Sequence, residues 1–249
     1  MRALYSVFML SVVTMFLTPI VYLFGLFGRT QRRAYIMVRM WARTLIKLFG
    51  VHIRIVGAHR VDFNQPVIYM SNHLSMADIP VLMTAIPAGL AFVAKASLAN
   101  VPFLGWSMRM VGMVFISRRD SRRDVNTLQQ AVDAIPADMN FLVFPEGTRS
   151  DLAGRDLAPL KKGGFHMAMA SGRTIVPVAL GSTERLMPKD SLAIFAGPAT
   201  VRFGNPINPT EYDCIESLMQ AYRTEMDTLF ALHRPQEESL PELQPRQIS

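Results

Sequence analysis

The 249 residues of the chain allow one sizeable domain with an added segment, and a hydrophobic content of 50% excludes an intrinsically disordered protein. The single cysteine, Cys214, excludes an internal disulfide and a multi-cysteine zinc site, so a reducing compartment is the simplest interpretation. The net charge of +7 comes from residues 1–61, which carry nine Lys or Arg and no acidic residue, and this favours an anionic lipid surface over nucleic acid as partner.

The first predicted element is a helix over residues 3–28, a run without a charged residue. At about 1.5 Å per residue, a helix of this length exceeds a hydrocarbon core of roughly 30 Å. A cleaved signal peptide is the alternative, but the run is too long for its apolar segment and no small-residue cleavage site follows. In a spanning helix, the arginines that follow outweigh Arg2, so the positive-inside rule keeps the rest of the chain in the cytoplasm.

Residues 30–49 predict a second helix, which is basic and amphipathic. Arg39, Arg43 and Lys47 recur every four residues and share one side, while apolar residues cover much of the rest. Such a helix suits the headgroup region of a membrane, and ordinary packing on the domain is compatible with it. The two helices together also allow a hairpin that dips into one leaflet, and the sequence leaves spanning and dipping open.

From residue 51 onward, short runs rich in Val, Ile and Phe alternate with helical stretches. This alternation predicts an α/β fold, with a mostly parallel or mixed central sheet flanked by helices. The predicted strands are 51–57, 66–70, 90–94, 113–117, 140–144, 174–180 and 194–203. The predicted helices of this part are 77–86, 103–110, 121–134, 161–171 and 211–232.

Proline marks two of the later segments. The strand 174–180 contains Pro177, which cannot donate to a ladder, so we expect an edge strand or a bulge there. Residues 234–249 are polar and carry three prolines, which is typical of a disordered tail.

The first candidate for chemistry is the segment Ser71–Asp78, between a buried strand and an apolar helix. His73 and Asp78 would lie about 140° apart on a regular helix and would not meet. They meet if His73 lies in the loop and Asp78 in the first helical turn, which gives a base held in one tautomer by a carboxylate. The alternative is a structural histidine near a helix start, and a metal site is disfavoured because no third ligand has suitable spacing.

The second candidate is the sequence FLVFPEGTRS at residues 141–150, in which a strand leads into a turn. Backbone N–H groups at such a turn, with the Arg149 guanidinium beside them, can bind a phosphate. Glu146 either holds Arg149 in place or accepts a hydrogen bond from a substrate hydroxyl. The alternative is a tight turn with a solvated Glu–Arg pair of little energetic weight.

The third candidate is Arg118, at the end of the predicted strand 113–117. The end of a strand is where α/β sheets usually bind ligands. The arginines at 119, 122 and 123 that follow are interpreted as a solvated helix face.

These blocks, in this order, resemble the glycerolipid acyltransferase family typified by the bacterial 1-acyl-sn-glycerol-3-phosphate acyltransferases. The blocks that carry the resemblance are His73 with Asp78, Gly112 to Arg118, Glu146 to Arg149, and the apolar run Ile175 to Leu180 around a proline. The stretches Lys95 to Trp106 and Lys161 to Gly164 are also similar. The resemblance covers roughly residues 50–210, and ordered blocks are far more specific than any single motif.

The resemblance implies an acyltransferase domain over residues 51–233, between a membrane-anchoring two-helix segment over residues 1–50 and the tail 234–249. With the charge pattern, it places the protein at the inner (cytoplasmic) membrane with the catalytic domain on the cytoplasmic side.

The resemblance also implies a reaction. His73 would take the proton from the sn-2 hydroxyl of 1-acyl-sn-glycerol-3-phosphate, and Asp78 would orient the imidazole. The oxygen would attack the thioester of acyl-CoA or acyl-carrier protein and give phosphatidic acid, without a covalent acyl-enzyme, a metal or another cofactor. The residues implied in binding the phosphate and glycerol of the acceptor are Arg118, Glu146, Gly147, Thr148, Arg149 and Lys161.

Three alternatives stay open at the level of sequence. In the first, the acceptor is another lysolipid, such as lysophosphatidylethanolamine or a lyso-ornithine lipid. In the second, the protein is a lipid esterase or thioesterase in which His73 activates water, although no G-x-S-x-G nucleophile elbow is present. In the third, the protein is a non-catalytic membrane scaffold, against which the intact His73 and Asp78 argue.

Overall fold

The computed structural model describes residues 1–27, 31–95, 99–101, 105, 108–109, 113–116, 139–150 and 156–232. Arg118, the predicted helix 121–134, most of the predicted helix 103–110 and the predicted tail 234–249 lie outside these residues.

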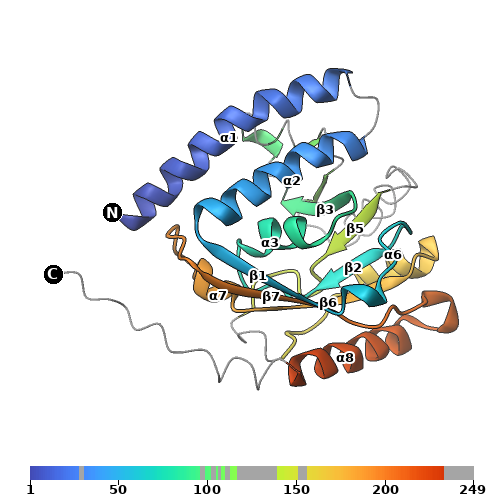
Figure 1. Ribbon diagram of the computed structural model, residues 1–249. Helices are drawn as coiled ribbons and strands as arrows, with labels where there is room; N and C mark the ends of the chain where they lie inside the picture. The colour runs from blue at the N-terminus through green and yellow to red at the C-terminus, as the bar shows by residue number, and fades with distance from the viewer. Residues whose placement is uncertain are drawn as a thin grey trace.

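A seven-stranded sheet forms the centre of the protein (Figure 1). Its strand order is β1-β7-β6-β2-β5-β3-β4, and every neighbouring pair is parallel except β6 with β7. The strands are β1 (Val51–Val56), β2 (Ile68–Ser71), β3 (Leu90–Lys95), β4 (Val114–Ile116), β5 (Asn140–Val143), β6 (Ile175–Gly181) and β7 (Gly197–Phe203). The predicted strands and the predicted α/β class with a mixed sheet are confirmed.

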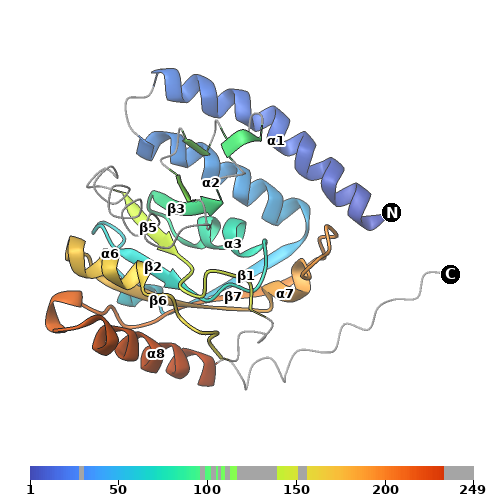
Figure 2. The same cartoon turned by 180° about the vertical axis from the view of Figure 1, so that it is seen from behind.

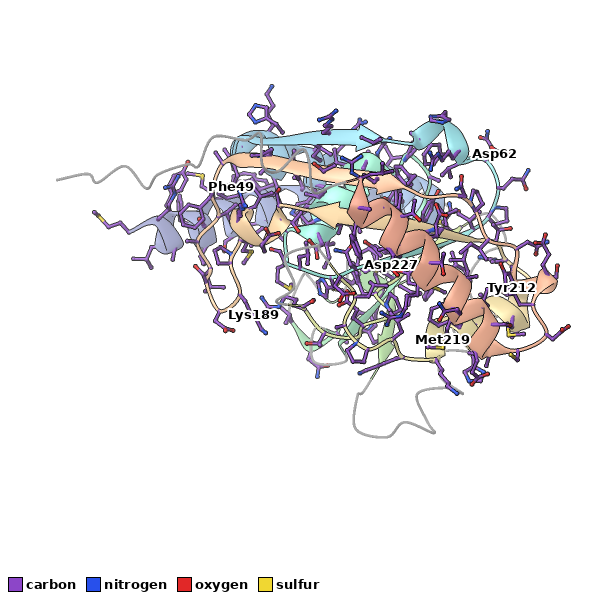
Figure 3. The ribbon with its side chains drawn as sticks, turned by 90° about the horizontal axis from the view of Figure 1, so that it is seen from below. Phe49, Asp62, Lys189, Tyr212, Met219 and Asp227 are labelled. Carbon is purple, nitrogen blue, oxygen red and sulfur yellow. The ribbon has the colours of Figure 1, made fainter. Side chains whose placement is uncertain are left out.

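Helices cover both faces of this sheet. Helices α2 and α3 lie on one face with α1 outside α2, and α6 and α8 lie on the other (Figures 1 and 2). Seen from below, α8 crosses the lower face, with Met219 and Asp227 along its length (Figure 3). The helices are α1 (Arg2–Phe27), α2 (Gln31–Leu48), α3 (Asp78–Ala85), α6 (Gly163–Ser171), α7 (Thr183–Leu186) and α8 (Ile215–Ala231), with 3-10 turns η1 (Ala58–Arg60) and η3 (Pro209–Glu211). The short helix α7 was not predicted.

Successive residues of the inner strands point to opposite faces, and this alternation builds two hydrophobic cores. In β5, Leu142 joins the core beneath α2 and α3, whereas Phe141 and Val143 join the core against α6 and α8. In β2, Tyr69 and Met70 divide in the same way. Each fully buried side chain of this kind stabilises the fold by about 1.5–3 kcal/mol, so both layers hold the central strands in place.

The two N-terminal helices pack along each other, and both predicted helices are confirmed as helices. The Trp41 indole N–H in α2 donates to the Thr14 hydroxyl in α1 at 3.1 Å. Among the described residues, no helix has the length and apolarity needed to cross a membrane. Arg39 donates to the Thr84 carbonyl in α3 at 3.2 Å, whereas Arg43 is exposed, so the basic side of α2 serves both domain packing and the surface.

Strand β6 is not an edge strand, which corrects one reading of the proline at its centre. It pairs with β2 on one side and with β7 on the other. The bulge reading is right: from the Val178–Phe203 pair to the Ile175–Ile207 bridge, β6 moves by three residues and its partner by four. The extra residue interrupts the ladder opposite Pro177, where no N–H is available to donate.

The sheet brings three loops to one place. Strands β2, β5 and β6 are neighbours and parallel, so their carboxyl ends meet at the same edge. The segments that leave these ends carry His73, Glu146 and Thr183. This edge is where open α/β sheets bind ligands.

Candidate active site

His73 and Asp78 lie in contact at this edge, in the arrangement that their spacing required. His73 lies in the loop after β2, and Asp78 is the first residue of α3 and reaches back toward the loop. His73 Nδ1 lies 2.7 Å from Asp78 Oδ2. An ionised carboxylate only accepts hydrogen bonds, so it favours the tautomer with the proton on Nδ1 and leaves Nε2 with a lone pair.

The Asp78 carboxylate is held on all sides. Oδ2 also accepts hydrogen bonds from the backbone N–H groups of Leu74 at 2.7 Å and Ser75 at 2.9 Å. Oδ1 accepts a hydrogen bond from the Thr183 hydroxyl at 2.5 Å. The Asp78 side chain is fully buried, so these donors replace the water that an ionised carboxylate would otherwise bind.

The His73 ring is packed but accessible. It stacks on the Phe144 ring with the centroids 4.2 Å apart and 21° between the planes. Its side chain is 14% exposed, compared with 0% for Asp78. The His73–Asp78 pair, called the dyad below, therefore has a buried carboxylate end and an imidazole end that an incoming group can reach.

Glu146 lies directly beneath the His73 loop and is only 2% exposed. Its Oε1 accepts from the His73 backbone N–H at 2.9 Å, and its Oε2 accepts from that of Ala158 at 3.1 Å. The Ser150 side chain also bonds to it, and the Ser150 N–H donates to the His73 carbonyl at 2.6 Å. Burial raises the pKa of Glu146, and the donors from His73 and Ala158 oppose that rise. The carboxylate thus joins three segments, and the contact with a substrate hydroxyl that the sequence suggested stays a prediction.

The turn after Glu146 forms the open flank of the site. Gly147 has a φ of 70°, in the left-handed region that favours glycine, and a Cβ added there would lie 2.8 Å from Lys161 Nζ. The Lys161 side chain therefore passes over the turn, and its backbone N–H donates to the Pro145 carbonyl at 2.8 Å. Thr148 and Lys161 are exposed and Arg149 is half-buried, so polar groups of the predicted binding block face outward.

Two residues of this edge were missed at the level of sequence. Asn72 receives the Leu180 N–H on Oδ1 at 2.7 Å and donates from Nδ2 to the Leu180 carbonyl at 3.0 Å, which ties the start of the loop to β6. Asn72 directly precedes His73 in the sequence, and this position could have marked it as a candidate for fixing the loop. Thr183 stands 105 residues from Asp78, and no spacing pattern pointed to it.

Other predictions about the site concern metals and Arg118. Within the described parts of the chain, no group of three or more His, Cys, Asp or Glu side chains is placed to hold a metal ion. Arg118 lies outside the described residues, so its predicted role stays a prediction. The described residues supply a base with a defined free nitrogen and, beside it, a turn flanked by two cationic side chains.

Comparisons with known proteins find related sequences over much of this chain. The family described as Acyltransferase matches residues 52–181, which include His73, Asp78 and Arg149. The 1-acyl-sn-glycerol-3-phosphate acyltransferase of Saccharomyces cerevisiae is 32% identical over 208 residues, covering 82% of this chain and 68% of the yeast protein. The human 1-acyl-sn-glycerol-3-phosphate acyltransferase alpha is 29% identical over 187 residues, covering 74% of this chain and 65% of the human protein.

A solved structure shares the whole fold. It is the crystal structure of PlsC, the 1-acyl-sn-glycerophosphate (LPA) acyltransferase of Thermotoga maritima, with a TM-score of 0.80 and 24% identity. The alignment covers 94% of this chain and 95% of that chain. Against longer relatives the coverage is smaller, and the chain spans 55% of the chloroplastic enzyme BAT2 of Brassica napus.

Proposed function

Because this chain belongs to the acyltransferase family, we propose that it transfers a fatty acyl group to the sn-2 hydroxyl of 1-acyl-sn-glycerol-3-phosphate and forms phosphatidic acid. The observation that carries the chemistry is the 2.7 Å contact between His73 Nδ1 and the fully buried Asp78 carboxylate, with the imidazole end exposed. The named activity of the relatives supports the choice of acceptor.

In this proposal, His73 is the general base. Its Nε2 accepts the proton of the acceptor hydroxyl as the hydroxyl oxygen attacks the carbonyl carbon of an acyl thioester. The tetrahedral intermediate collapses, the carbon–sulfur bond breaks, and the proton on Nε2 passes to the departing thiolate. The products are the new ester and a free thiol, so no acyl group becomes covalently attached to the protein. Asp78 stabilises the imidazolium that exists between the two proton transfers.

The acceptor phosphate is assigned to the open flank of the site. Arg149 follows Gly147 by two residues, the Lys161 side chain passes over the Gly147 turn, and neither cation is buried. An arginine can hold a phosphate with two parallel hydrogen bonds, and a lysine adds a point charge. Gly147, Thr148 and Arg118 are proposed to complete this site, whereas the hydrogen bonds of Glu146 give it a supporting position under His73.

The reaction is placed at the cytoplasmic surface of a membrane, with acyl-CoA or acyl-carrier protein as the donor. Helix α1 exposes large apolar side chains, among them Leu4, Tyr5, Phe8, Met15 and Phe16. Exposed apolar residues of this size, followed in sequence by a basic helix, suit an anionic lipid interface. A lysolipid acceptor and an acyl chain both partition into that interface.

The proposed activity is tested with purified protein, anionic vesicles, acyl-CoA and a panel of lysolipids. We expect thiol release that depends on lysophosphatidate, together with phosphatidic acid as the product in mass spectrometry. His73→Ala is the control for contaminating activity.

Two results would redirect the assignment. Thiol release that is equally fast without any lysolipid, with free fatty acid as the product, identifies a thioesterase. Faster transfer to lysophosphatidylethanolamine or a lyso-ornithine lipid than to lysophosphatidate identifies a different acceptor.

A further inference from the structure

Among the described residues, Thr183 supplies the side-chain hydrogen bond to Asp78 Oδ1, the carboxylate oxygen that does not contact His73. Its hydroxyl lies 2.5 Å from Asp78 Oδ1, and both residues are 0% exposed. Because Asp78 is fully buried, removing the hydroxyl takes this donor away from an enclosed carboxylate oxygen. A charge-assisted hydrogen bond of this kind is roughly twice as strong as one between neutral groups.

The backbone around Thr183 fixes the position of this hydroxyl. Ser182, the residue before it, has a φ of 65°, in the left-handed region that costs a residue with a Cβ roughly 1–2 kcal/mol. At the other end of α7, the Met187 carbonyl accepts a hydrogen bond from the Ser75 hydroxyl at 2.7 Å. Helix α7 is therefore bonded at both ends to the His73–Asp78 loop.

We propose that Thr183 is a positioning residue for the dyad: by holding Oδ1 of Asp78, its hydroxyl keeps Oδ2 directed at His73 Nδ1. The residue touches neither substrate and acts only through the carboxylate. The proposal rests on the proposed function for its effect on turnover, and on the structure alone for its effect on the His73 ring.

The kinetic test uses two pairs of variants that differ at the hydroxyl. The parent and Thr183→Val have nearly the same shape, and so have Thr183→Ser and Thr183→Ala. We expect kcat to fall on the order of tenfold within each pair when the oxygen is lost, with the KM of both substrates unchanged, because only the base is affected. Thr183→Ser should stay within about threefold of the parent, since it keeps the donor.

Thr84→Val is the matched control. Thr84 lies in α3, and its hydroxyl is buried without a hydrogen-bond partner in the described part of the chain. Replacing it by valine should leave kcat unchanged. If Thr183→Val retains parental kcat, or if the Ser and Ala variants are equally slow, the hydroxyl has no positioning role and the proposal is wrong.

A second readout does not depend on activity. In histidine-labelled protein, NMR should show a strongly deshielded Nδ1–H proton for His73, as expected of a short bond to a carboxylate. Thr183→Val should weaken or broaden this signal, and Thr183→Ser should keep it. An inactive parent that shows the signal would overturn the proposed function, and the variants would still decide the role of Thr183. An unchanged signal in a folded Thr183→Val protein would overturn the positioning role.

Discussion

The two halves of the candidate site are built differently. On the dyad side, every oxygen of the Asp78 and Glu146 carboxylates accepts a hydrogen bond from the protein, and both side chains are buried. On the phosphate side, Thr148 and Lys161 are exposed and Arg149 is half-buried. The groups proposed to move protons are fixed before any ligand arrives, and the groups proposed to bind the acceptor are left open to it.

This difference follows from what each half has to do. A general base is effective only when its tautomer and direction are set, so preorganisation of the dyad lowers the barrier directly. A cationic binding surface has to exchange water for a phosphate in every cycle, and full pairing within the protein would compete with the ligand. Changes on the dyad side should therefore lower kcat, and changes on the phosphate side should raise KM.

The largest effect is expected for His73→Ala. Loss of a general base typically costs on the order of 100- to 10,000-fold in turnover. The fold and vesicle binding should be retained, because the imidazole is at the accessible end of the dyad. Thiol release measures turnover, circular dichroism the fold, and flotation with vesicles the membrane binding. Activity within tenfold of the parent would contradict the role of His73.

Asp78→Asn should lower kcat by about 100-fold, less than the roughly 10,000-fold loss of the equivalent change in a serine-protease triad. Here the N–H groups of Leu74 and Ser75 orient the amide oxygen toward His73, and the amide nitrogen can donate to the Thr183 oxygen. The tautomer is kept and only the negative charge is lost. Steady-state kinetics of Asp78→Asn and Asp78→Ala measure this, and equal losses in both would show that the backbone donors do not orient the amide.

Arg149→Ala tests the phosphate side of the candidate site. Losing a bidentate, charge-assisted pair costs roughly 1.5–3 kcal/mol, so the KM for lysophosphatidate should rise about tenfold to 150-fold, with little change in the KM for the acyl donor. Arg149→Lys should restore part of the affinity, since an ammonium cannot reproduce the planar fork. The control acceptor is a lysolipid without a terminal phosphate. If both acceptors suffer equally, the phosphate site lies elsewhere.

The smallest effect concerns the pH dependence of stability at Glu146. Burial raises the pKa of its carboxyl above the ordinary value of 4.5, so between these two values the folded state holds more protons than the unfolded state. This group therefore makes the free energy of unfolding fall as pH rises through that window, by at most about 1.4 kcal/mol per pH unit. Urea unfolding of the parent and Glu146→Gln between pH 4 and pH 7 measures this contribution. As pH rises, the free energy of unfolding of the parent should fall relative to that of the variant. Identical slopes would mean that burial does not shift this carboxyl.

Sequence patterns located the elements well and the dyad correctly, because both depend on local spacing. The reach from Asp78 back to His73 followed from helical geometry alone. The inward direction of Glu146 did not, because it is set by N–H donors on separate segments. Pro177 left an edge strand and a bulge open, and the choice depended on strand order: β6 is central, and the bulge that tolerates the proline lies between Phe203 and Ile207, just after β7. Thr183 could not be found from local spacing either, because it lies 105 residues from Asp78 in the sequence.

The hydrogen bonds around the dyad differ greatly in the length of chain that they close. The His73–Asp78 contact closes a loop of five residues, Glu146 reaches His73 across 73 residues, and Thr183 reaches Asp78 across 105. In the simplest polymer treatment, closing the longest of these loops costs about 3 kcal/mol more chain entropy than closing the shortest. A ribosome releasing this chain from its N-terminus delivers the base and its carboxylate together. Glu146 is synthesised later, and Thr183 only 105 residues after Asp78.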